Sequence, residues 1–175
     1  MSLLDDPMMK EIVDEFCDEA ADLFTQLEDI LDEIEDHPDK FSVGLEQFGQ
    51  IIDRVMGAAK SIGVDEVAKF CELGKIIGYK SSQVTDKKLQ EIAVAVMFDT
   101  VDLLIKMNEK TRTGSDSSLK NLSTKTFPTR LHWLSEKFKD IDRASCSFDE
   151  KQSTDLSKEE DPQQSIDDLL NDLGL

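Results

Sequence analysis

Five acidic residues in this chain are followed four positions later by a glutamine, a spacing that places both side chains on one face of a helix. A carboxylate and an amide held side by side in this way can position a polar reactant. The five pairs are Asp22/Gln26, Glu46/Gln50, Asp86/Gln90, Glu159/Gln163 and Glu160/Gln164. Because five pairs share this short pattern, the choice among them depends on the elements that carry each pair.

Residues 164–175 form a second candidate site, a short acidic amphipathic segment. Its apolar side chains recur at i, i+3, i+4 and i+7, and its acids take the opposite face: Ile166, Leu169, Leu170 and Leu173 against Asp167, Asp168 and Asp172. The segment is shorter than an isolated helix that is stable in water. We therefore expect it to order only on a partner, as an amphipathic helix in a groove. The alternative is a C-terminal helix docked on its own domain.

Helical periodicity dominates the rest of the chain, and no stretch alternates convincingly as a strand does. Breaks at His37-Pro38, Gly63 and Ser81-Ser82 divide residues 1–111 into four helical stretches. We predict an all-α protein whose first 111 residues form an up-and-down four-helix bundle. The other predicted parts are a polar linker (112–126), an accessory helix (127–141), a disordered acidic linker (142–163) and the flexible amphipathic tail (164–175).

The charge balance restricts the class of partner. Twenty Lys and Arg residues against 38 Asp and Glu give a net charge of −18, which disfavours nucleic acid and anionic membrane surfaces. A basic patch is the expected complement. No apolar stretch is long enough to cross a bilayer, and three widely spaced cysteines suit neither a metal site nor a disulfide framework. These features predict a cytoplasmic protein that neither holds a metal nor inserts into a membrane.

The C-terminal segment resembles the C-terminal peptide of the CheZ family, the phosphatases of bacterial chemotaxis. The positions that match are Ile166, Asp167, Asp168, Leu169, Leu170, Leu173, Gly174 and Leu175. A similar pattern begins the flagellar switch protein FliM. Peptides of both kinds bind the response regulator CheY, so the resemblance implies that residues 164–175 bind a phosphorylated CheY-type receiver.

The stretch from Glu46 to Met56 is similar to the catalytic run of the same family. Gly49, Gln50, Ile52, Arg54 and Met56 coincide with it, and Glu46 stands where the family has Asp. The resemblance implies that Gln50 aligns water on the acyl phosphate while Glu46 engages a lysine of the receiver. The receiver would supply Mg²⁺ and the phosphorylated Asp, so this chain needs no cofactor of its own. Two alternatives to Glu46/Gln50 stay open. The catalytic pair could be Asp22/Gln26, or all of these residues could be solvated polar side chains with no catalytic role.

Residues 9 to 80 also resemble the histidine-phosphotransfer (HPt) domain, which implies an HPt-like bundle. The small residues after Met56 carry the match: Gly57, Ala58, Ala59, Ile62 and Gly63. Asp53, however, stands at the position of the phosphorylated His, and His37 and His132 lie outside the motif. We therefore expect Asp53 and Gly57 to form a receiver-docking face without phosphotransfer chemistry. Packing between helices of the bundle is the alternative role for Gly57.

Together these observations predict a chemotaxis regulator that binds phosphorylated CheY and promotes its dephosphorylation. A non-catalytic adaptor or phospho-CheY sink, docked at the chemotaxis kinase or the polar cluster, is the rival hypothesis. A degenerate phosphotransfer module with an unrelated receiver is a third. Substoichiometric protein would clear phosphate only if it is an enzyme, so turnover distinguishes the first two.

Overall fold

The structure is a computed structural model that describes residues 4–139 and 162–175. Its elements are α1 (Pro7–Asp36), the 3-10 turn η1 (Pro38–Lys40), α2 (Phe41–Ile62), α3 (Asp65–Ser81), α4 (Lys87–Thr113), α5 (Leu119–Leu122), α6 (Thr126–Lys137) and α7 (Pro162–Asp172). No β-strand occurs in these two ranges, and the predicted all-α fold class is confirmed.

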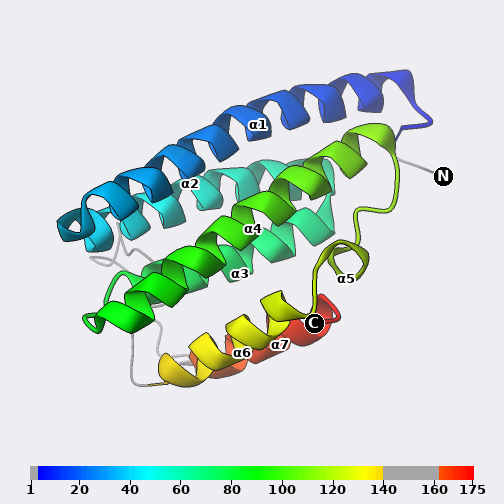
Figure 1. The fold of residues 1–175 in the computed structure, drawn as a ribbon. Helices are drawn as coiled ribbons and strands as arrows, with labels where there is room; N and C mark the ends of the chain where they lie inside the picture. The colour runs from blue at the N-terminus through cyan, green and yellow to red at the C-terminus, as the bar shows by residue number, and fades with distance from the viewer. Residues whose placement is uncertain (1–3, 140–161) are drawn as a thin grey trace, which may run out of the picture.

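The four long helices pack in chain order, and the last returns to the first. α1 lies against α2, α2 against α3 and α3 against α4, while α4 also packs along α1 (Figure 1). Local signals set their ends. The side chain of Asp6 caps α1 by accepting from the Met8 N–H at 2.9 Å, and Asp86 caps α4 by accepting from the Leu89 N–H at 2.9 Å. Gly63 ends α2 in the left-handed region at φ 79°.

A short helix occupies part of the stretch that we expected to be a linker. α4 continues to Thr113, and α5 follows within residues 112–126. Leu119 of α5 is fully buried, and its backbone N–H donates to Glu66 Oε1 of α3 at 3.0 Å. One buried leucine and one hydrogen bond thus attach the polar connection to the bundle, which composition alone did not indicate.

Helices α6 and α7 form a second layer on the bundle, where they lie side by side (Figure 1). α6 packs on α4 and α7, and α7 packs on α3 and α6. Phe127 of α6 meets Phe70 of α3 edge to face, with ring centroids 5.9 Å apart. The predicted accessory helix is therefore present, although α6 ends at Lys137. Most of the predicted acidic linker, residues 142–163, lies outside the described residues.

The C-terminal segment is helical without a partner. All four residues of its apolar stripe are buried on the protein's own helices: Ile166, Leu169, Leu170 and Leu173. The expectation of a flexible tail is therefore wrong, and the docked alternative describes this structure. The physical reason lies in α3, where 12 of the 17 residues are buried. A helix that is apolar on so many sides needs more cover than its two bundle neighbours supply.

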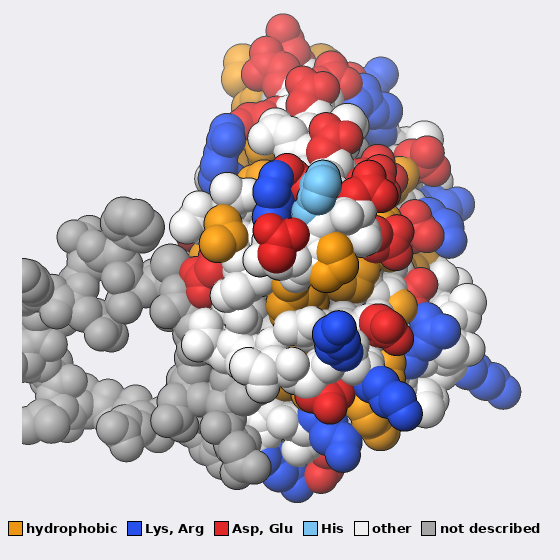
Figure 2. Space-filling view, turned by 60° about the vertical axis from the view of Figure 1, so that its left-hand side comes forward, with side chains coloured by type: hydrophobic (Ala, Val, Ile, Leu, Met, Phe, Trp, Pro, Cys, Tyr) orange, Lys and Arg blue, Asp and Glu red, His pale blue; other side chains and the backbone are white. Residues whose placement is uncertain are grey.

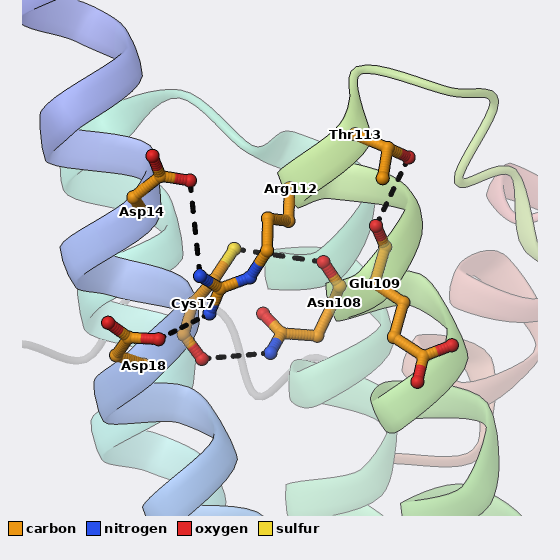
Figure 3. A network of polar contacts seen from close by, with 7 residues as sticks. All are labelled: Asp14, Cys17, Asp18, Asn108, Glu109, Arg112 and Thr113. Carbon is orange, nitrogen blue, oxygen red and sulfur yellow. Dashed lines mark hydrogen bonds and ion pairs between the residues drawn. The ribbon is translucent and has the colours of Figure 1, made fainter.

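A polar network joins α1 to α4, buried at Cys17 and Asn108 and partly exposed at Arg112 (Figure 3). Asn108 donates from Nδ2 to the carbonyl oxygen of Cys17 at 2.9 Å, and Cys17 Sγ lies 3.7 Å from the carbonyl oxygen of Asn108. Arg112, one turn further along α4, forms ion pairs with Asp14 and Asp18 of α1. Burial raises the pKa of the Cys17 thiol, against the opposing effect of the Arg112 charge. This network fixes how the two longest helices align.

Candidate functional site

The four residues singled out on α2 lie along the side of that helix that borders α3. Glu46, Gln50, Asp53 and Gly57 are spaced i, i+4, i+7 and i+11, so they share one flank. Glu46 Oε1 accepts from Ser82 Oγ at 3.0 Å, just beyond the end of α3. Two helical turns further along α2, Asp53 Oδ1 accepts from Lys75 Nζ at 2.7 Å. We call this surface the α2–α3 flank: Glu46, Gln50, Asp53 and Gly57 with Lys75 and Ser82.

Glycine explains why side chains of α2 and α3 can meet along this edge. A Cβ on Gly49 would lie 2.5 Å from Cε1 of Tyr79, whose side chain is buried. From the other helix, a Cβ on Gly78 would lie 3.5 Å from Phe48 and 3.6 Å from the backbone oxygen of Leu45. The helices therefore approach closely here, so the side chains of Glu46 and Ser82 are long enough to form a hydrogen bond.

Gly57 has the opposite environment from Gly49. It is exposed, and a Cβ built on it would meet no atom of residues 4–139 or 162–175 within 4 Å. Packing inside the bundle, the alternative role considered for Gly57, is therefore wrong. A glycine in the interior of a helix costs about 1 kcal/mol relative to alanine, and no contact with the described residues offsets that cost. The open space at Gly57 leaves a shallow place on the flank where another surface can approach.

The carboxylates of the flank are bonded within the chain, whereas the Gln50 amide is exposed to solvent. The ion pair of Asp53 with Lys75 is only partly exposed, with 48% and 21% of the two side chains accessible. Glu46 is half-buried, and Gln50 is exposed between the two carboxylates. An exposed amide offers both a donor and an acceptor. The arrangement can therefore position a water molecule or a partner's polar group beside two oriented carboxylates.

The structure separates the competing acid and glutamine pairs. Asp22 and Gln26 are both exposed on α1, so they remain an alternative. Asp86 is already used as the N-cap of α4, and the Gln90 amide donates to the carbonyl oxygen of Val84 at 2.8 Å. That pair therefore has a local structural role. Glu159 and Glu160 lie outside the described residues.

The predicted binding tail is presented with its two faces in different surroundings. Asp167, Asp168 and Asp172 are exposed, although the apolar stripe beneath them is buried. Ser135 of α6 donates from Oγ to Asp167 Oδ1 at 3.5 Å, a long hydrogen bond. Gly174 ends the segment at φ 73° beside the Lys120 side chain, and Leu175 is half-buried. The α2–α3 flank thus lies where α3 meets α2, whereas the tail lies where α3 meets α7.

A pocket of about 540 Å³ lies elsewhere, where α1 ends and α2 and α4 begin. Figure 2 brings this end of the bundle forward and shows hydrophobic side chains surrounded by acidic and basic ones. Its lining combines both kinds: Ile34, Glu35, Pro38, Phe41, Lys87, Gln90, Glu91 and Val94. Of the candidate pairs, only Asp86/Gln90 contributes to this lining, through Gln90, and no residue of the α2–α3 flank or of the tail belongs to it.

Comparison with known proteins finds no matching family model, no similar curated protein and no similar solved structure. In residues 4–139 and 162–175, no helix has the length and apolar composition needed to cross a bilayer. Over the same ranges, no three His, Cys, Asp or Glu side chains gather as metal ligands would.

Proposed function

We propose that this protein is a cytoplasmic chemotaxis regulator that binds a phosphorylated CheY-type receiver and promotes loss of its phosphate. The observation that carries the proposal is the α2–α3 flank, where exposed Gln50 lies between two carboxylates and the open space at Gly57 follows two helical turns further along α2. The resemblance of Glu46–Met56 to a phosphatase run and of the bundle to an HPt domain points to the same flank. The tail, residues 164–175, would provide the second contact with the receiver.

In this mechanism the chain supplies position rather than a nucleophile. The receiver would dock over Gly57, with its phosphorylated Asp and Mg²⁺ facing Gln50. The Gln50 amide would orient the attacking water, as a glutamine does in GTPases. Glu46 would leave Ser82 and engage the receiver's active-site lysine, while Asp53, held by Lys75, would face the docked surface. A water held in line with the acyl phosphate hydrolyses faster because the entropy of bringing it there is already lost.

The test is phosphate release from acyl-phosphorylated CheY with substoichiometric amounts of this protein. We expect acceleration by the wild-type chain, and a loss of roughly a hundredfold in Gln50→Ala, equivalent to about 2.7 kcal/mol of barrier. Gln26→Ala is the matched control, because it removes an exposed amide from α1 and should leave the rate unchanged. If Gln26→Ala is inactive and Gln50→Ala is active, the site lies on α1 instead.

A non-catalytic adaptor is the second candidate function, and a specific observation favours it. Both carboxylates of the flank already have partners within the chain, Ser82 for Glu46 and Lys75 for Asp53. A docking surface can keep those contacts, whereas the phosphatase must release Glu46. An adaptor would bind phosphorylated CheY one to one without accelerating phosphate loss, so the same assay decides between the two.

A further inference from the structure

The apolar stripe that would contact the receiver is already covered by the chain's own helices. Ile166 and Leu170 are inaccessible to solvent, and Leu173 is 3% exposed. Their cover comes from α3 and α6, the two helices on which α7 packs. Because one side-chain surface cannot pack on two partners at once, the docked form of α7 excludes the amphipathic contact that the sequence suggests.

We infer that α7 is an intramolecular latch, which the receiver must release before it can bind the stripe. The inference rests on the proposed function, since the receiver is the competing partner. It adds a regulatory step: the protein exists in a closed form with α7 on α3 and α6, and in an open form with the stripe available. Only the open form makes both the tail contact and the contact at the α2–α3 flank.

The attachment of α7 has the character of a contact that can be reversed. The helix has 11 residues, fewer than an isolated helix needs, so undocking and loss of helical order are coupled. The hydrogen bond that α6 donates to it, from Ser135 Oγ to Asp167 Oδ1, is 3.5 Å long. The stripe itself provides most of the attachment, and the receiver can replace that apolar contact with one of the same kind.

The acidic face of α7 offers the receiver a first contact while the latch is closed. Asp167, Asp168 and Asp172 remain exposed while the stripe is buried. A receiver with a basic patch can therefore meet the closed form electrostatically before the stripe is released. The apparent affinity then falls in proportion to the fraction of open molecules, so a latch that is open about one-tenth of the time weakens binding about tenfold.

A reversible cross-link tests the latch within one molecule. Ser135→Cys and Asp167→Cys place two thiols where these side chains meet, and Cys146→Ser removes a competing thiol. Cys17 and Cys71 are buried, so they do not interfere. Calorimetric titration with CheY phosphorylated by a small acyl phosphate should show at least tenfold weaker binding by the oxidised form, restored on reduction. Equal affinity of the two forms overturns the latch.

A second variant leaves the tail unchanged and opens the latch from the other side. Ser135→Glu introduces a carboxylate against Asp167, and the repulsion should release α7 and tighten receiver binding by severalfold, whereas Ser135→Ala should behave as the wild type within about twofold. Weaker or unchanged binding by Ser135→Glu contradicts the inference. If the reduced and wild-type chains do not bind the receiver at all, the proposed function fails, and the latch fails with it.

Discussion

The α1–α4 and α2–α3 contacts join antiparallel helices of the same bundle by different means. Between α1 and α4, a buried amide, Asn108, bonds to the backbone of Cys17, with the Arg112 ion pairs beside it. Between α2 and α3, glycine at position 49 lets the helices approach, and the polar contacts lie at the edge. In the α1–α4 contact, polar groups align the two helices. In the α2–α3 contact, the polar groups lie at the surface.

This difference assigns different roles to the two contacts. The buried Asn108 amide bonds through Nδ2 only in the alignment in which it meets the Cys17 carbonyl oxygen, while its Oδ1 has no partner among the described residues, so losing the Nδ2 bond would leave the whole amide unbonded. Glycine carries no such preference, but it brings two helices close enough for side chains from both to form one exposed surface. We therefore expect substitutions in the α1–α4 contact to change stability alone, and those on the α2–α3 flank to change partner binding or catalysis.

The largest expected effect comes from a methyl group at the α2–α3 contact. Gly49→Ala places a Cβ 2.5 Å from the buried Tyr79 ring, which has little room to move. Such overpacking should lower the free energy of unfolding by about 3 kcal/mol, measured by urea denaturation.

Gly57→Ala is the matched control, since it adds the same methyl group to the same helix in open space. It should raise the free energy of unfolding by up to about 1 kcal/mol. Gly57→Leu should also fold, yet block the approach of a receiver to the flank. Equal destabilisation by the two alanine substitutions would remove the distinction between a packing glycine and an open one.

The next largest effect is a dependence of stability on alkaline pH. Burial raises the pKa of the Cys71 thiol, on α3, well above its ordinary value near 8.5. Below about pH 8.5 the thiol is protonated in both the folded and the unfolded chain. At higher pH it ionises only in the unfolded chain, so the free energy of unfolding should fall by about 1.4 kcal/mol per pH unit.

Denaturation of the wild type and of Cys71→Ala between pH 8 and pH 10 measures this contribution. The variant should show the shallower decline, because it lacks the thiol that only the unfolded chain can ionise. Parallel curves for the two proteins would show that Cys71 ionises as readily in the folded chain as in the unfolded one.

The smallest of the three effects concerns the α1–α4 contact. Asn108→Ala removes the hydrogen bond to the Cys17 carbonyl oxygen and should lower the free energy of unfolding by about 1.5 kcal/mol. The proposed stimulation of CheY dephosphorylation, measured under conditions where the variant is folded, should be the same as that of the wild type. Loss of that activity together with stability would place the α1–α4 contact in the functional machinery and contradict the division of roles.

Much of the architecture could be predicted because helical periodicity and breaks are local properties. The four long helices, the accessory helix and the shared flank of Glu46, Gln50, Asp53 and Gly57 follow from spacing alone. The roles of individual glycines do not follow from spacing. Gly49 and Gly57 lie on the same helix, yet a Cβ on Gly49 would meet a ring of α3 and one on Gly57 would meet nothing in the described part of the chain, which depends on how the helices are placed.

The tail shows most clearly where local information ends. Periodicity correctly predicted which face of residues 164–175 is apolar, because that face is a property of one helix. What covers the face depends on a second surface, and α3 provides it. The signal was present, since apolar residues of α3 such as Ala68, Phe70 and Leu73 are not confined to one stripe.

The sequence by itself therefore determined the helices, their polar and apolar faces, and the acidic charge that any partner must complement. Only the tertiary structure decided which faces meet: α7 on α3 and α6, Gly49 on Tyr79, and Asp53 on Lys75. The physical reason is that a face is set by residues within a few turns, whereas its occupant is set by competition among all apolar surfaces of the chain.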